Sequence, residues 1–387
     1  MIYSIPYILI TVIFGVIAML YSSLPPENEA AKKNMDIVCI ALFILFFGLR
    51  GYVGDDWMNY TKFYQDCSLD NISFNILKMG SESNYEPGYT ILNLICKAIT
   101  DEYVFFQLVC CCINVFLLYI FLKRNVSNVP LGFMLYVCMG GFLMSINLMR
   151  NTFAILIFAN AVQFIEKRKP VEYFSLCLLA LSFHLSSLMY FPLYFFMHKK
   201  CNKWVFLAIF ALGNLLFVSH AKVVTALLSG VGSIVSDKMS SVVELYTEEY
   251  DTSKGLSIGY LERLITGTLM ICYYDKLTGL KKSNIIFMNM GLIYFSIAFL
   301  FSEFDVMSQR LSTLFTIFYW VIWSDLLSCY AYDNNKRLFI SFMAIYSVLK
   351  VAGLSHFITY DYDNFLFGHK SYNERMYIHS DYKYDDN

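Results

Sequence analysis

Long apolar runs separated by short polar connections recur along almost the whole chain. Eleven such runs can be recognised, and most are close to the roughly 20 residues that a helix needs to cross a bilayer. They cover residues 3–22, 36–49, 103–122, 130–148, 150–165, 171–197, 203–220, 258–275, 284–301, 309–328 and 337–353. We therefore predict an all-α, polytopic integral membrane protein.

The composition supports this class and excludes others. Hydrophobic residues make up 58% of the 387 positions and charged residues only 15%, whereas a soluble domain has roughly 25% charged residues. The net charge of −1 argues against a nucleic-acid partner. The 11 cysteines form no metal-ligand pattern, and no nucleotide-binding loop is present, so we expect neither a metal nor another cofactor.

The charges in the connections predict how the chain threads the membrane. Short connections rich in Lys and Arg should stay cytoplasmic. The long segments 51–86, 221–257 and 354–387 carry more acidic than basic residues, so we place them outside. With this threading, residues 1–353 form one membrane domain, and 354–387 form a polar, external C-terminal tail.

Two segments do not fit a simple span. Residues 171–197 run from one basic connection to the next, and 27 residues are too few for two spans of about 20 residues. We predict a re-entrant helical hairpin that turns near Phe183, with a single long tilted helix as the alternative. Residues 87–99 are too short to span and predict a half-helix on the outer face. The expected total is about ten transmembrane helices plus these two features.

Four arginines lie at or near the ends of apolar runs, and the predicted threading places all four ends on the outer face. They are Arg50, Arg150, Arg263 and Arg310. Four cations at one surface favour an anionic ligand, most simply the phosphates of a lipid-linked substrate. Local alternatives exist for two of them, because Arg50 could pair with a following aspartate and Arg263 could be neutralised by Glu262.

Three further residues could act as acids or bases. Asp56 follows the second apolar run, Glu86 precedes Pro87 at a predicted helix start, and His184 lies within an apolar run. A lone histidine there is more often a core residue, but at a hairpin tip it could accept a proton or contact a phosphate. Trp57, Tyr60 and Tyr89 could stack on sugar rings, or could belong to the aromatic belt of the membrane interface.

The order of these elements resembles the EpsG family of Wzy-like exopolysaccharide and capsule polymerases. The family's Arg-x-x-x-Gly-x-Asp-x-x-x-Tyr element is matched by Arg50, Gly54, Asp56 and Tyr60. Its other elements are matched by Glu86-Pro87-Gly88-Tyr89, by Leu148-Met149-Arg150, by Phe183-His184-Leu185-Ser186 and by Arg310. The residue after Arg150, often Gln in the family, is Asn151 here. The resemblance covers roughly residues 40–330.

The resemblance implies a GT-C/Wzy-like fold and a specific reaction. Such proteins join oligosaccharide repeat units carried on undecaprenyl pyrophosphate, at the outer face of the bacterial cytoplasmic (inner) membrane. The growing glycan leaves its lipid and is transferred to a sugar hydroxyl of the next lipid-linked unit. The arginines would hold the pyrophosphate, and His184, Asp56 or Glu86 would take the hydroxyl proton. The expected partners are membrane lipid and the flippase and chain-length regulator of the same pathway.

Two other functions remain open at this point. An O-antigen-type ligase, or another lipid-linked sugar transferase, would use the same arginines with a different acceptor. A flippase or exporter of lipid-linked sugars should show internal repeats and mid-membrane charges. We find no repeat, and the charges cluster at one interface, which counts against a transporter.

Overall fold

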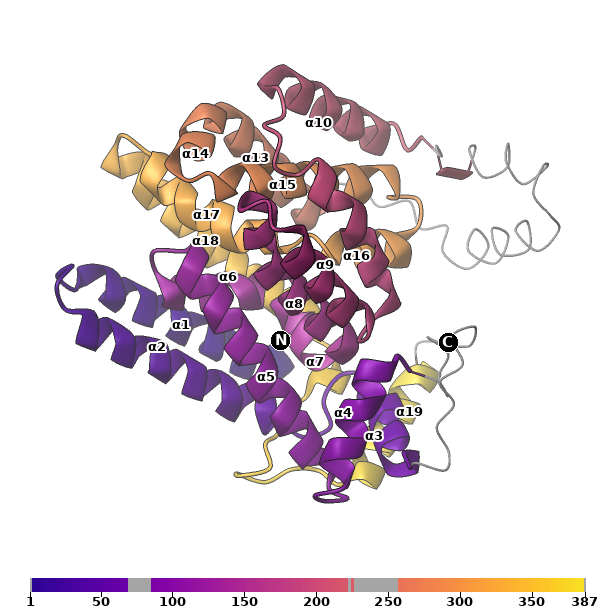
Figure 1. Ribbon diagram of the computed structural model, residues 1–387. Helices are drawn as coiled ribbons and strands as arrows, with labels where there is room; N and C mark the ends of the chain where they lie inside the picture. The colour runs from indigo at the N-terminus through magenta and orange to yellow at the C-terminus, as the bar shows by residue number, and fades with distance from the viewer. Residues whose placement is uncertain (1, 69–84, 222–223, 226–256, 386–387) are drawn as a thin grey trace, which may run out of the picture. The chain divides into compact units, whose positions relative to one another are not determined.

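The computed structural model describes residues 2–68, 85–221, 224–225 and 257–385 (Figure 1). The secondary structure of these residues is helical, apart from two isolated antiparallel β-bridges near Asn364. Their contacts group the chain into two compact units. Unit 1 comprises Met1–Tyr194 and Tyr330–Asn387, and unit 2 comprises Phe195–Cys329.

Unit 1 contains the N-terminal helices and the C-terminal end of the chain. Within it, α8 is buried along most of its length and packs against α5, α7 and α9, so it forms the centre of this unit. In Figure 1, α1 and α2 lie side by side. The helices of this unit are α1 (Ile5–Ser23), α2 (Glu29–Phe43), α3 (Trp57–Asp66), α4 (Pro87–Lys97), α5 (Tyr103–Asn125), α6 (Val129–Tyr136), α7 (Phe142–Ile146), α8 (Met149–Glu166), α9 (Pro170–Leu181), α18 (Asp333–Leu354) and α19 (Tyr372–Asp385).

Several short non-α turns interrupt or follow these helices. Two are π-helical, η2 (Ile44–Gly48) after α2 and η4 (Val137–Gly141) between α6 and α7. Three are 3₁₀ helices, η1 (Ile2–Ser4), η5 (Leu185–Phe195) and η6 (Ile358–Tyr360). Such turns commonly mark functional regions in helical proteins, and η2 leads directly into Arg50.

Unit 2 is built around α15 (Ser283–Leu300), which packs against α10, α16 and α17. Its other helices are α10 (Lys203–Val218), α13 (Ile258–Cys272), α14 (Tyr274–Leu280), α16 (Asp305–Thr313) and α17 (Ile317–Cys329). Almost every residue of α17 is buried.

Five described helices are long and apolar enough to cross a membrane. They are Ile2–Ser23, Tyr103–Asn125, Val129–Ile146, Ser283–Leu300 and Asp333–Leu354. A sixth span results if Met307–Thr313 and Ile317–Cys329, which meet at an angle of 61°, count as one broken span. The chain is thus an all-helical protein with several candidate spans, but the expected number of about ten is not confirmed. Several apolar runs end early: α2, α10 and α13 have only 15 to 16 residues.

The apolar run 171–197 folds back on itself. The helix α9 ends at Leu181, and η5 begins four residues later at Leu185. The Tyr173 hydroxyl donates to the main-chain carbonyl of Tyr190 over 2.6 Å, so the two arms run side by side. The break falls where the sequence predicts a turn. Entry of this hairpin into a membrane from one side stays a prediction.

The segment predicted as a half-helix forms α4, whose two sides differ in exposure. Ile91 and Ile95 are exposed, whereas Tyr89, Asn93 and Cys96 are buried against the rest of unit 1. An exposed apolar stripe on a short helix is typical of an interfacial helix. Its position on the outer face of a membrane stays a prediction.

Candidate functional site

A buried ion pair joins two of the predicted site residues, Glu86 and Arg150. Glu86 is the residue that precedes α4, and its carboxylate is almost fully buried. Its Oε2 lies 2.6 Å from Nη1 of Arg150, at the start of α8. Its Oε1 accepts a hydrogen bond of 3.0 Å from the main-chain N–H of Leu185, at the start of η5. One carboxylate therefore connects three motifs that lie far apart in the sequence.

The guanidinium of Arg150 also interacts with two tyrosines. It lies over the ring of Tyr85, 4.0 Å from the ring centroid, and it interacts electrostatically with the buried hydroxyl of Tyr60. Its Nε is buried and has no hydrogen-bond partner among the described residues. The side chain keeps 16% of its surface exposed, so the cation is fixed in place without being sealed from solvent.

His184 lies in the turn between α9 and η5, next to the amide that Glu86 binds. Its ring is half-buried, and its Nδ1 lies 2.7 Å from the Ser186 hydroxyl and 3.2 Å from the Ser186 main-chain nitrogen. The structure thus brings His184 to the same junction as Glu86 and Arg150.

The glycine at position 88 explains how α4 approaches this turn so closely. Its N–H donates to the carbonyl of Ser182 over 2.7 Å. A Cβ at Gly88 would lie 2.3 Å from Oγ and 2.8 Å from the carbonyl oxygen of Ser182. Only glycine permits this contact, so the Glu-Pro-Gly-Tyr element is built to dock on the end of α9.

Arg50 occupies a separate and deeper position in unit 1. Its side chain is buried, and it donates to the main-chain carbonyls of Phe47 and Ile146. The side chain of Gln107 binds the carbonyls of Gly48 and Arg50, which fixes the chain as it leaves η2. The Nε of Arg50 has no partner among the described residues. Arg50 also lines a small cavity with residues of α2, α5, α7 and α8.

The loop after Arg50 needs a glycine at position 54. Gly54 has a φ of +88°, which residues with a side chain rarely adopt, and its Cβ would lie 2.1 Å from Oδ1 of Asn147. That oxygen accepts the N–H of Asp55 instead. Asp56 follows, half-buried, at the residue before α3. The structure therefore places Asp56 at a helix start in the same unit as Glu86.

The C-terminal segment folds onto this loop, a contact that the sequence did not reveal. Asn364 forms an antiparallel bridge with Arg50, and Gly51 donates its N–H to the carbonyl of Asp363 over 3.0 Å. Gly54 donates to the carbonyl of Thr359 over 2.9 Å. The segment predicted as a polar tail thus supplies main-chain partners to the motif that contains Arg50.

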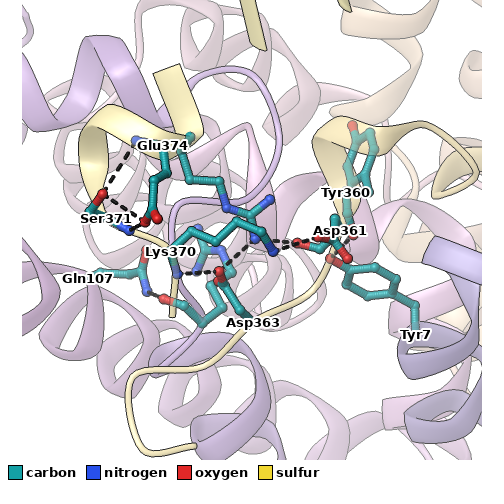
Figure 2. A network of polar contacts seen from close by, with 10 residues as sticks. Tyr7, Gln107, Tyr360, Asp361, Asp363, Lys370, Ser371 and Glu374 are labelled. Atoms are coloured by element: carbon teal, nitrogen blue, oxygen red, sulfur yellow. Dashed lines mark hydrogen bonds and ion pairs between the residues drawn. The ribbon is translucent and has the colours of Figure 1, made fainter. Parts of the chain in front are cut away.

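A network of charged side chains holds the C-terminal segment together (Figure 2). The buried guanidinium of Arg375, on α19, pairs with Asp363 over 2.8 Å, and Lys370 pairs with Asp361 over 2.7 Å. Ser371 and Glu374 form a capping box at the start of α19. The Ser371 N–H and hydroxyl bonds lower the pKa of Glu374. These contacts fix α19 beside the loop that follows Arg50.

The three aromatic residues proposed to bind sugar are buried. Trp57 packs against Tyr52 and Tyr372, with ring centroids 5.0 and 5.3 Å away. Tyr60 and Tyr89 belong to a cluster of buried residues that also contains Tyr85. Contact of these rings with a sugar stays a prediction, and the Tyr60 hydroxyl also interacts electrostatically with Arg150.

The two remaining arginines lie in unit 2. Glu262 accepts hydrogen bonds from Thr266 and Tyr319, at 2.7 and 3.1 Å, while Arg263 interacts electrostatically with Tyr294 and Tyr319. Arg310 is exposed in the last turn of α16. The gathering of these two cations with Arg50 and Arg150 stays a prediction.

No group of three or more His, Cys, Asp or Glu side chains suited to a metal ion occurs among the residues that the structure describes. The junction itself contains a fixed cation, a carboxylate, an imidazole and main-chain donors. Cations and hydrogen-bond donors of this kind stabilise developing negative charge when they are held rigidly.

Fold and site together define a helical membrane protein with a buried, cation-containing polar junction. The sequence profile of the EpsG family matches residues 33–367, most of the chain, and the protein belongs to that family. The match extends beyond both ends of the range 40–330 over which the motifs predicted it. No curated protein and no solved structure matches the chain. Membership in this family indicates a role in polysaccharide biosynthesis at a membrane.

Proposed function

We propose that this protein is a polysaccharide polymerase that acts on undecaprenyl-pyrophosphate-linked oligosaccharides. It would work at the outer face of the bacterial cytoplasmic membrane, in a pathway with a flippase and a chain-length regulator. The observation that carries this proposal is the junction at which Glu86 binds both Arg150 and the Leu185 amide beside His184. It unites three of the family's motifs in one place.

The reaction that we propose is a displacement at the anomeric carbon of the growing glycan. A sugar hydroxyl of the incoming lipid-linked unit forms the new C–O bond, and the bond from the anomeric carbon to the pyrophosphate oxygen breaks. The bonding electrons leave with undecaprenyl pyrophosphate, and the hydroxyl proton passes to a base. Negative charge therefore develops on the pyrophosphate, where fixed cations have their largest effect.

Within this proposal, the pyrophosphate is bound by arginine. Arg150 fits this role best, since the carboxylate of Glu86 and the ring of Tyr85 hold its guanidinium while part of it stays exposed. Arg50, Arg263 and Arg310 are proposed to contribute further positive charge. Among these three, Arg310 is exposed and Arg50 is buried. A buried Arg50 can bind the pyrophosphate only if the substrate reaches into unit 1. Otherwise it would act indirectly, by holding the loop that follows it in place.

The proton acceptor is proposed to be one of His184, Asp56 and Glu86. Both oxygens of Glu86 already have partners, at 2.6 and 3.0 Å. Glu86 would therefore at least position Arg150 and the turn that carries His184. Trp57, Tyr60 and Tyr89 would shape the sugar-binding region.

A reconstituted assay tests the proposal. The purified protein in liposomes would receive the undecaprenyl-linked oligosaccharides that accumulate in source cells lacking this gene. We expect a ladder of products that grows by one repeat unit per step and releases undecaprenyl pyrophosphate. Transfer of a single glycan to an acceptor without a lipid carrier would indicate a ligase instead. Movement of the substrate across the bilayer without a new glycosidic bond would indicate a flippase.

A further inference from the structure

The contacts of His184 determine which of its ring nitrogens carries the proton. The main-chain nitrogen of Ser186 lies 3.2 Å from Nδ1 in hydrogen-bonding geometry. A main-chain N–H can only donate, so Nδ1 must present its lone pair. A neutral imidazole has one N–H, which is therefore on Nε2. The Ser186 hydroxyl, 2.7 Å from the same Nδ1, can donate to it as well.

The main chain around His184 keeps the ring in this arrangement. The His184 N–H donates to the carbonyl of Ala180 over 3.1 Å, and its carbonyl accepts from Ser187 over 3.1 Å. The preceding side chain, Phe183, stacks on Phe153 of α8 with a centroid distance of 4.8 Å. The turn is thus anchored on both sides of His184. Because Ser186 is only two residues further along this fixed turn, its position relative to the His184 ring is fixed as well.

The neighbours of this turn favour an anionic partner. The next amide, that of Leu185, is bound by Glu86, whose other oxygen holds Arg150. Glu86 therefore links the histidine turn and the Arg150 guanidinium through one side chain. The carboxylate binds the main chain of the turn, not the imidazole, so it fixes the Arg150 guanidinium and the backbone that carries the His184 ring. A guanidinium and a ring N–H on elements joined in this way suit the oxygens of a phosphate or pyrophosphate group.

We propose that His184 is a hydrogen-bond donor rather than the catalytic base. Its Nε2–H stabilises the charge that develops on the departing pyrophosphate, and Ser186 is a positioning residue that fixes the tautomer. This inference rests on the proposed polymerase function and assigns a role within that site. The lone pair that a base would need is at Nδ1, where Ser186 occupies it. The hydroxyl proton then passes to a carboxylate, Asp56 or Glu86.

Amide substitutions distinguish a donor from a base. The side-chain NH₂ of glutamine can reach the place of Nε2, whereas the shorter asparagine places its amide near Nδ1. Neither amide can act as a base. We expect His184→Gln to polymerise within about tenfold of the wild type, while His184→Asn and His184→Ala lose about 10²–10³-fold, as for the loss of one donor to a developing oxyanion. His184→Gln should also lose any dependence of rate on imidazole protonation.

A catalytic base at position 184 predicts a different result in the same assay. If His184 is the base, His184→Gln falls as far as His184→Ala, by about 10²–10⁴-fold. That outcome, or an Asn variant as active as the Gln variant, overturns the donor role. A wild-type protein that makes no ladder contradicts the proposed function itself, so the two failures are distinguishable. Each variant is first checked for normal elution and thermal unfolding.

A second measurement does not depend on the folding of a variant. Production in a histidine auxotroph supplied with 2-fluorohistidine replaces all six histidines by a near-isosteric ring that keeps an N–H donor but is a much weaker base. We expect the fluorinated protein to stay active near neutral pH, with fluorinated His184→Gln as the matched control. Loss of activity in the fluorinated protein, but not in that control, contradicts the donor role.

Discussion

Glu86 and Arg150 are 64 positions apart in the sequence, and their side chains meet at 2.6 Å in a mostly buried ion pair. A buried carboxylate and a mostly buried guanidinium each need a partner, since an unpaired charge in such a place is costly. Around this pair the structure assembles the beginnings of α4, α8 and η5.

Removal of the carboxylate should destabilise unit 1. Glu86→Ala leaves Arg150 without its ion pair and the Leu185 N–H without its acceptor, at a cost of about 3–5 kcal/mol. Thermal unfolding of the purified protein in detergent measures this loss. The control is Glu172→Ala, because Glu172 forms an exposed pair with Lys169, and we expect no measurable change. Equal unfolding of both variants would show that the buried pair does not hold the junction together.

The Gly54 position tests the loop that follows Arg50. Gly54→Ala introduces a Cβ 2.1 Å from Oδ1 of Asn147 at a φ of +88°, so we expect reduced abundance and lower thermal stability. Gly353→Ala is the matched control, because no atom lies within 4 Å of its added Cβ. That change should leave stability unchanged or raise it by up to about 1 kcal/mol, the usual helix preference for alanine. A Gly54→Ala protein as stable as this control would contradict the described loop geometry.

The C-terminal helix should be necessary for the loop at Arg50 to keep its structure. Arg375→Met leaves Asp363 buried without its partner, which we expect to cost about 3–5 kcal/mol. Lys370→Met in the same segment breaks a half-exposed pair with Asp361 and should cost about 0–1 kcal/mol. Limited proteolysis after α18 measures release of the segment. Similar protection of both variants would argue that the Arg375 pair does not anchor the segment.

Cysteine labelling tests the predicted threading. Of the 11 cysteines, only Cys112, Cys201 and Cys272 are not buried, so replacing these three gives a background for single cysteines. We expect an impermeant reagent to label position 59, in the predicted outer segment 51–86. Positions 167, 199 and 281 lie in Lys- and Arg-rich connections that we predict to be cytoplasmic, and they should not be labelled. Outside labelling of 281 would overturn the threading, and labelling of 199 without 167 would exclude the hairpin.

Local signals in the sequence predicted local structure well. Pro87 indicates a helix start, and α4 does begin at Pro87 with Glu86 before it. The turn between α9 and η5 falls at Phe183, as the length of the run and its flanking charges predict. Each of these features depends on neighbouring residues, which is why a single sequence contains the information.

Features that depend on distant contacts could not be predicted in this way. The C-terminal segment has an ordinary polar composition, yet Asn364 and Asp363 bind main-chain groups more than 300 positions earlier. Tyr60 has the appearance of a sugar-stacking residue, and only the fold reveals that its side chain is buried and interacts electrostatically with Arg150. The number of about ten spans is not confirmed, because apolar composition does not record where an α-helix ends, and α10 and α13 have only 15 to 16 residues.

The most direct test of the central claim, that Arg150 serves the chemistry of a polymerase, is the ladder assay with purified Arg150→Lys. Lysine keeps the positive charge beside Glu86 but loses the planar, multiply donating guanidinium. We predict normal abundance and unfolding temperature with a loss of polymerisation of about 10²–10³-fold, comparable to removal of a fixed donor to a developing oxyanion. Lys169→Arg, which alters an exposed cation, should polymerise like the wild type. An Arg150→Lys protein that builds the ladder at the wild-type rate would contradict the account.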